Sequence, residues 1–74
     1  MDEFKRLDTG QRAAVEQAIA AAREQGGRQA VELPGGAEAY AYRMARGRIA
    51  WGVNGGEHGF NIARGVREPD RERG

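Results

Sequence analysis

The side chains in this sequence that could take part in catalysis are few and scattered. Serine and cysteine are absent, Thr9 is the single threonine, and His58 is the single histidine. Nucleophilic catalysis needs a hydroxyl or thiol paired with a base, and this chain offers almost no such pair. His58 stands beside glycines in an expected hairpin, where a histidine side chain faces water. The sequence therefore predicts a protein that is not an enzyme, with no catalytic residues.

Metal ions and cofactors are not expected either. The chain has no cysteine for a thiolate site, and it lacks a set of other metal ligands. Glu32, Glu38 and Glu57 stand at expected peripheral positions, whereas a carboxylate pair for acid–base catalysis needs burial. The glycine pairs at 35–36 and 55–56 lie between expected strands, whereas a phosphate-binding loop connects a strand to a helix. The sequence predicts no metal site and no cofactor.

Arginine is the residue type with the greatest potential for binding, since 12 residues are basic and only Lys5 among them is not arginine. Its forked donors suit carboxylate and phosphate groups. Neighbouring exposed cations add little to folding, because exposed pairs are worth at most about 1 kcal/mol even when opposite in sign. Arg43, Arg46, Arg48 and Arg64 are therefore the predicted binding residues, for an acidic protein patch or a phosphate backbone. The alternative is that they only reflect an arginine-rich composition.

The elements that must position these arginines are antiparallel strands. Side chains alternate between the two faces of a strand. Arg46-Gly47 is typical of a two-residue hairpin turn, and such a turn places Tyr42 opposite Trp51. The expected bulky face then includes these residues of both strands: Tyr40, Tyr42, Met44, Ile49, Trp51 and Val53.

Two further strands extend this sheet in the expected register. Turn residues at 34–37 and 54–57 separate them from their neighbours. Val31 and Leu33 join the bulky face from one side, and Phe60 and Ile62 from the other. The opposite face is smooth and dotted with arginine, and its members are Ala39, Ala41, Arg43, Ala45, Arg48, Ala50, Gly52, Gly59, Asn61 and Ala63.

One helix is expected before the sheet, over residues 11–25. Val15, Ala18, Ile19 and Ala22 form an apolar stripe, and Asp8 or Thr9 can cap the helix. The sequence thus predicts an α+β fold, in which one N-terminal helix packs on one face of a four-stranded antiparallel β-meander. Residues 1–66 form the expected single domain, and residues 67–74 an expected flexible charged tail.

Composition limits the partners and the cellular location that are expected. The net charge of +1 does not by itself indicate a nucleic-acid partner. No apolar run reaches the length of a membrane span, and the N-terminus lacks the apolar core of a signal peptide. The sequence therefore predicts a cytoplasmic protein without a membrane partner.

A one-helix sheet without catalytic residues favours a role in binding. One face of the sheet stays open and can pair with a protein partner or with a second copy, so the chain is expected to be a monomer or a homodimer through that face. In size and make-up the chain resembles small phage-encoded inhibitors, the anti-CRISPR proteins in particular. That resemblance rests on no motif, and it implies binding to a CRISPR effector complex and a block on target DNA binding. The alternative is a small nucleic-acid-binding module that uses the arginine cluster, with aromatic side chains as a stacking platform.

Overall fold

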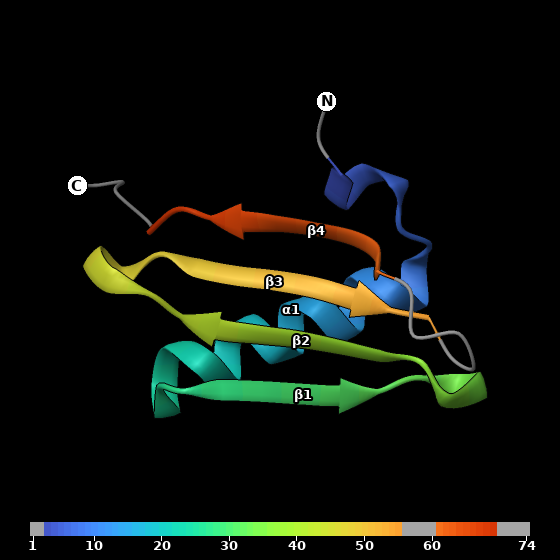
Figure 1. Cartoon of the computed structure of the whole chain (residues 1–74), viewed down its shortest axis with the longest axis horizontal. Coiled ribbons are helices and arrows are strands. Elements are labelled where there is room, and N and C mark those ends of the chain that lie inside the picture. Colours follow the sequence, from blue (N-terminus) through green and yellow to red (C-terminus); the bar gives the residue numbers. More distant parts are fainter. Residues whose placement is uncertain (1–2, 56–60, 70–74) are drawn as a thin grey trace.

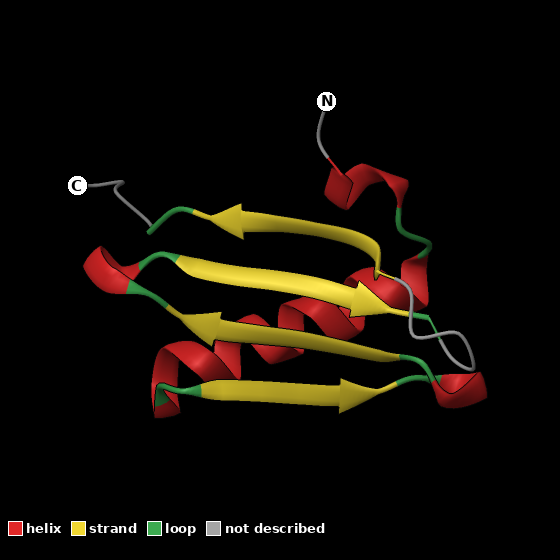
Figure 2. Ribbon diagram, viewed as in Figure 1, coloured by secondary structure: helices red, strands yellow, loops and turns green. Residues whose placement is uncertain are grey.

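The computed structural model describes residues 3–55 and 61–69, which form two layers. Four antiparallel strands form one sheet in the order β1-β2-β3-β4, and α1 crosses one of its faces (Figure 1). The short 3-10 helix η1 lies beside β4, at the edge of the sheet (Figure 2). This confirms the predicted α+β fold. The bounds are η1 Glu3–Arg6, α1 Thr9–Gln25, β1 Arg28–Glu32, β2 Glu38–Arg43, β3 Ile49–Asn54 and β4 Asn61–Arg67.

The start and the buried stripe of α1 agree with the sequence prediction. The Asp8 carboxylate accepts a hydrogen bond from the Gln11 backbone at 2.7 Å, and the Gln11 side chain accepts one from the Asp8 backbone at 3.0 Å. This reciprocal capping box satisfies two amides that the helix cannot pair internally. The side chains of the predicted stripe are all buried against the sheet: Val15, Ala18, Ile19 and Ala22.

The predicted register between β2 and β3 is wrong by one residue. Tyr42 lies opposite Ala50 rather than Trp51, and Trp51 lies opposite Ala41. The Met44 amide donates to the Arg48 carbonyl at 2.7 Å, so the hairpin loop has three residues, Ala45–Gly47. Arg46 has a φ of 66° and Gly47 a φ of 75°, which places both in the left-handed region.

This shift separates the aromatic residues that were predicted to share a face. Ile49, Trp51 and Val53 are buried under α1, as expected, but β2 contributes Ala39 and Ala41 to that side. Tyr40, Tyr42 and Met44 lie on the opposite face, so the prediction that they belong to the core is wrong. The predicted small-residue face is wrong for the same reason, because Ala39, Ala41 and Ala63 are core residues.

Hydration of the tyrosine hydroxyls provides a physical reason for the observed register. A buried tyrosine must find a hydrogen-bond partner for its hydroxyl, whereas β2 can present Tyr40 and Tyr42 to water at no such cost. Alanines on the other side of β2 let α1 approach closely. Ile49, Trp51 and Val53 then fill the core from β3, and no charged side chain is buried among the residues that the structure describes.

The hairpin between β1 and β2 has the same kind of loop. The Leu33 amide donates to the Ala37 carbonyl at 2.8 Å, which leaves the three residues Pro34–Gly36 in the turn. Val31 therefore lies opposite Ala39 rather than Tyr40. Val31 and Leu33 still pack against the core, as predicted, because the one-residue shifts in the β1–β2 and β2–β3 pairings cancel.

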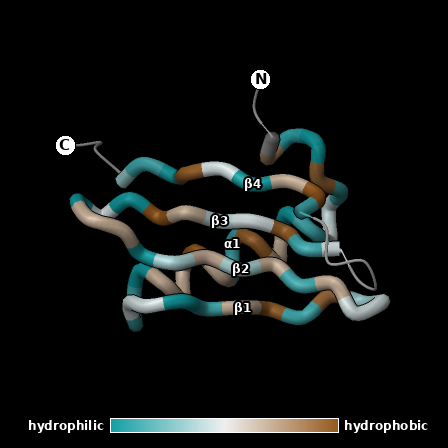
Figure 3. Tube along the Cα trace, viewed as in Figure 1, coloured by the Kyte–Doolittle hydropathy of each residue, from teal (hydrophilic) through white to brown (hydrophobic). Residues whose placement is uncertain are grey.

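β4 also departs from the expected pairing. Ile49 lies opposite Arg67 instead of Ile62, and an irregularity stands between β3 and β4 next to Asn54. Ile62 is 44% exposed, so its predicted place in the core is wrong. Hydrophobic and hydrophilic segments follow one another along β4 (Figure 3). The strand ends at Arg67, one residue into the predicted tail. The predicted positions of Phe60 and His58 lie outside the described residues.

Trp51 closes the core at the β4 side of the sheet. Its ring meets Phe4 of η1 edge to face, with centroids 5.7 Å apart. The indole crosses Gly65, where an added Cβ would lie 2.7 Å from the Trp51 Cζ2 atom. Arg67 covers the outside, with its guanidinium 5.4 Å from the Phe4 ring centre and its nitrogens 3.1 and 3.3 Å from the Glu16 carboxylate. η1, α1 and β4 are thereby joined around one side chain.

Candidate functional site

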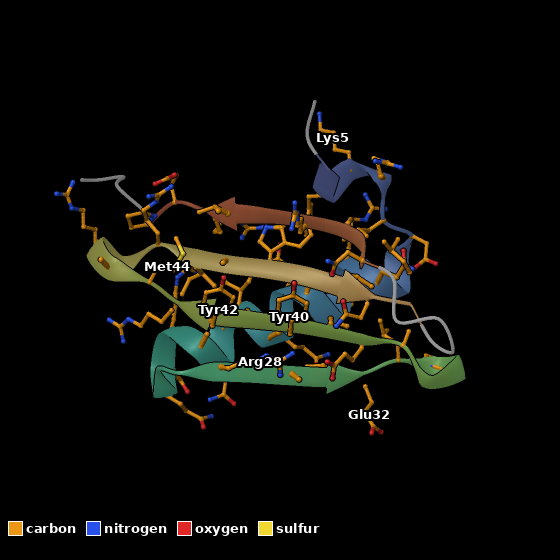
Figure 4. All side chains as sticks on the ribbon, in the orientation of Figure 1. Lys5, Arg28, Glu32, Tyr40, Tyr42 and Met44 are labelled. Carbon is orange, nitrogen blue, oxygen red and sulfur yellow. The ribbon has the colours of Figure 1, made fainter. Side chains whose placement is uncertain are left out.

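The sheet face turned away from α1 carries the most distinctive set of exposed residues. Tyr40, Tyr42 and Met44 follow one another along β2 on this side (Figure 4). Strand alternation brings small or polar residues beside them from the other three strands. We call this surface the open face, and its described members are Arg28, Ala30, Glu32, Glu38, Tyr40, Tyr42, Met44, Ala50, Gly52, Asn54, Arg64 and Val66.

Tyr40 is held in a fixed position on the open face. Its ring lies across β3 over Gly52, where an added Cβ would lie 2.8 Å from the Tyr40 Cε2 atom. The Arg28 guanidinium lies 4.9 Å from the ring centre and donates to the Glu38 carboxylate at 3.2 Å. A cation in this position is attracted to the ring face. Arg28 and Gly52 together favour the position in which the Tyr40 ring lies against the sheet.

Tyr42 stands next to a shallow depression in the middle of the open face. The depression has a volume of about 410 Å³. Ala50 and Gly65 contribute small groups to its lining, and Tyr42 itself is 42% exposed. The other residues that line it are Tyr40, Met44, Trp51, Arg64 and Val66. Aromatic and apolar side chains therefore surround a hollow with one cationic group in its wall.

The charges of the open face are balanced. Arg28 is paired with Glu38, and Glu32 lies opposite Glu38 across the β1–β2 ladder. At the other end of the strands, Arg48 forms an ion pair with Glu68 at 3.4 Å. With Arg64, the open face carries two arginines and two glutamates, and Arg46, Arg48 and Glu68 at the hairpin end add a net charge of one. A phosphate backbone is attracted by a large excess of positive charge, and here the excess is a single charge at the hairpin end.

The structure does not bring the four predicted binding arginines together. Arg43 lies on the helix side of the sheet, where its guanidinium donates to the Arg23 carbonyl at 3.3 Å near the end of α1. Its predicted place on the exposed sheet face is therefore wrong. Arg46 and Arg48 do lie close together, at and just after the tip of the β2–β3 hairpin.

Arg64 is also away from the position predicted for it. It lies opposite Gly52, while the residue beside Arg48 is Glu68. Arg64 and Glu68 are four positions apart, which is roughly 13 Å along a strand. Arg64 therefore belongs to the central depression, and Arg46 and Arg48 to the end of the face.

Other surfaces of the described chain are weaker candidates for a functional site. A groove of about 530 Å³ lies between the start of α1 and the Pro34 turn, but the Gln11 amide there is already bonded to Asp8. Within residues 3–55 and 61–69, no three histidine or acidic side chains gather as a metal site would require. No helix in this part of the chain is long and apolar enough to cross a bilayer.

Sequence reasoning missed the open face as a site because it placed the tyrosines in the core. A signal was present, since Ala50 and Gly52 alternate with Ile49, Trp51 and Val53 along β3. Small residues on one side of a strand leave room for large side chains from its neighbour. Comparison with models of protein families, with curated proteins and with solved structures finds no match to this chain.

Proposed function

We propose that this protein is a small non-enzymatic binding domain that regulates or inhibits another protein by docking its open face onto it. The composition of that face is the observation that supports this function. Tyrosine, methionine and arginine are residue types enriched in protein interfaces, and Tyr42 and Val66 are exposed at 42% and 45%. Small residues around them allow close approach of a second surface.

The charge balance favours a protein partner over a nucleic acid. Four arginines against three glutamates, with both ends of the face included, match a protein surface of mixed charge around an apolar centre. The alternative function, a nucleic-acid-binding module, is supported by Tyr42 next to Arg64 in the depression, since a base can stack on an aromatic ring beside a cation. The narrower proposal of an anti-CRISPR inhibitor, which binds a CRISPR effector subunit, stays a prediction.

Capture and direct binding test the proposed function together. The tagged chain is used to capture proteins from lysate of its source organism, and each protein identified is then purified and titrated against defined variants. Tyr42→Glu places a charge in the centre of the face and should weaken binding by at least about 100-fold, as loss of a buried aromatic anchor does. Gln17→Glu, on the exposed side of α1, is the matched control and should bind as the unchanged chain does.

Binding to single-stranded oligonucleotides tests the alternative function. Binding of a labelled oligonucleotide that weakens steeply with salt, and that Tyr42→Glu abolishes, would establish the nucleic-acid function instead. A purified protein target that binds Tyr42→Glu and the unchanged chain equally would contradict the open face as the interface.

A further inference from the structure

The open face has ends of opposite charge. Glu32 and Glu38 stand at the end where β1 runs into β2, and we call this the acidic end. Arg46 and Arg48 stand at the tip of the β2–β3 hairpin, at the opposite end of the strands, and we call this the basic end. Glu68 shares the basic end and offsets part of its charge through the pair with Arg48.

The acidic end is unfavourable in a single copy. Glu32 lies directly opposite Glu38 in the β1–β2 ladder, and like charges in that arrangement destabilise a sheet. Arg28 reaches Glu38 at 3.2 Å and offsets one of the two charges. A second source of positive charge placed over this end would relieve the remaining repulsion.

The basic end of a second copy meets that requirement. A two-fold axis that lies between two facing sheets and runs across their strands brings each acidic end over the basic end of the other copy. The same rotation places Tyr42, and the residues across the strands from it, over the partner's Tyr40 and the residues across from that. Each exposed Tyr42 ring then faces the Tyr40 ring of its partner, so the contact brings aromatic rings together as well as opposite charges.

The area is compatible with a weak dimer. Four strands about 4.8 Å apart, with about five residues each at roughly 3.3 Å, cover a face of roughly 19 by 17 Å. Two such faces in contact cover roughly 650 Å² in projection, which is below the roughly 1,000 Å² of a standard specific interface and in the range of a weak, transient one. Sheets that pack in this way lie about 10 Å apart, which the tyrosine and arginine side chains can span.

We infer that a second copy of this chain occupies the open face when no other partner does, in a two-fold homodimer with acidic end over basic end. This inference rests on the proposed function, because it takes the open face to be a protein interface. The second copy and a target protein compete for the same surface, so the dimer is a storage form that a target must dissociate.

A charge exchange tests this arrangement by sedimentation velocity, from micromolar to millimolar concentration at low salt. One variant carries Glu32→Lys and Glu38→Lys, and the other carries Arg46→Glu and Arg48→Glu. Each variant has two ends of like charge, so each should dimerise at least about tenfold more weakly than the unchanged chain. An equimolar mixture of the two restores both contacts and should form a heterodimer.

Circular dichroism first shows whether both variants keep their fold. If either does not, Tyr42→Glu against Gln17→Glu supplies the test, and only the first should abolish the dimer. An unchanged chain that stays monomeric at millimolar concentration overturns the homodimer, as do variants that dimerise as well as the unchanged chain. With either result, the proposed function remains supported if Tyr42→Glu still abolishes binding to the purified target.

Discussion

Trp51 is the residue on which the stability of this small domain depends most. It is buried and holds η1 through Phe4 and the edge of β4 through Gly65. Trp51→Ala should lower the free energy of unfolding by about 3–5 kcal/mol, which is the usual cost of removing a large buried aromatic side chain. The measurement is urea denaturation followed by circular dichroism. The native fluorescence of Trp51 should also be blue-shifted, and emission like that of free tryptophan would contradict its burial.

Gly65 and Gly52 form a matched pair for testing the two faces of the sheet. An added Cβ at Gly65 would meet the Trp51 ring, which the core holds in place, whereas at Gly52 it would meet the outer end of Tyr40. Gly65→Ala should therefore destabilise the fold by about 1–3 kcal/mol, as overpacking does. Gly52→Ala should cost clearly less, since Tyr40 can swing into solvent. Equal losses in thermal denaturation of the two variants would contradict the assignment of faces.

At the scale of elements, α1 depends on its capping box. Asp8→Ala removes the acceptor of the Gln11 amide and should cost about 0.5–2 kcal/mol. Thr9→Ala changes the first helical residue without removing a capping bond found in the structure, and it serves as the control. Chemical denaturation of both variants is the measurement. A smaller loss for Asp8→Ala than for Thr9→Ala would show that the box does not stabilise the helix.

The helix was predictable from sequence because its signals are local. A capping residue, an apolar stripe with helical spacing and two terminal glycines all act within a few residues. The number and order of the strands were predictable for the same reason, since turn residues separate alternating segments. These features were enough to give the α+β class and the meander.

The register of the strands was not predictable from turn residues alone. Arg46-Gly47 suits a two-residue turn, but Arg46 adopts a left-handed φ of 66° and extends the loop to three residues. A shift of one residue exchanges the two faces of a strand. The error therefore moved Tyr40 and Tyr42 into the predicted core and Arg43 onto the predicted binding surface. The burial of Ala39 and Ala41 under α1 decides between the two registers, because Ile49, Trp51 and Val53 are buried in both.

At the scale of the whole molecule, one helix covers one face of a four-stranded sheet and leaves the other to be covered or solvated. An antiparallel sheet tolerates water on one face when that face is polar. Here the middle of the open face is mostly aromatic and apolar, and apart from Arg28 and Arg64 its charges lie at the two ends of the strands. That distribution is typical of an interface with an apolar centre and a polar rim.

The central claim is that the open face is where this molecule meets other proteins. The most direct test places the photoreactive residue p-benzoylphenylalanine at Tyr42 in one version of the chain and at Gln17 in another, with irradiation in cells of its source organism. The account predicts protein cross-links from position 42, to a target or to a second copy, and none above background from position 17. Cross-links from position 17 alone would contradict it and assign the contact to the outer side of α1.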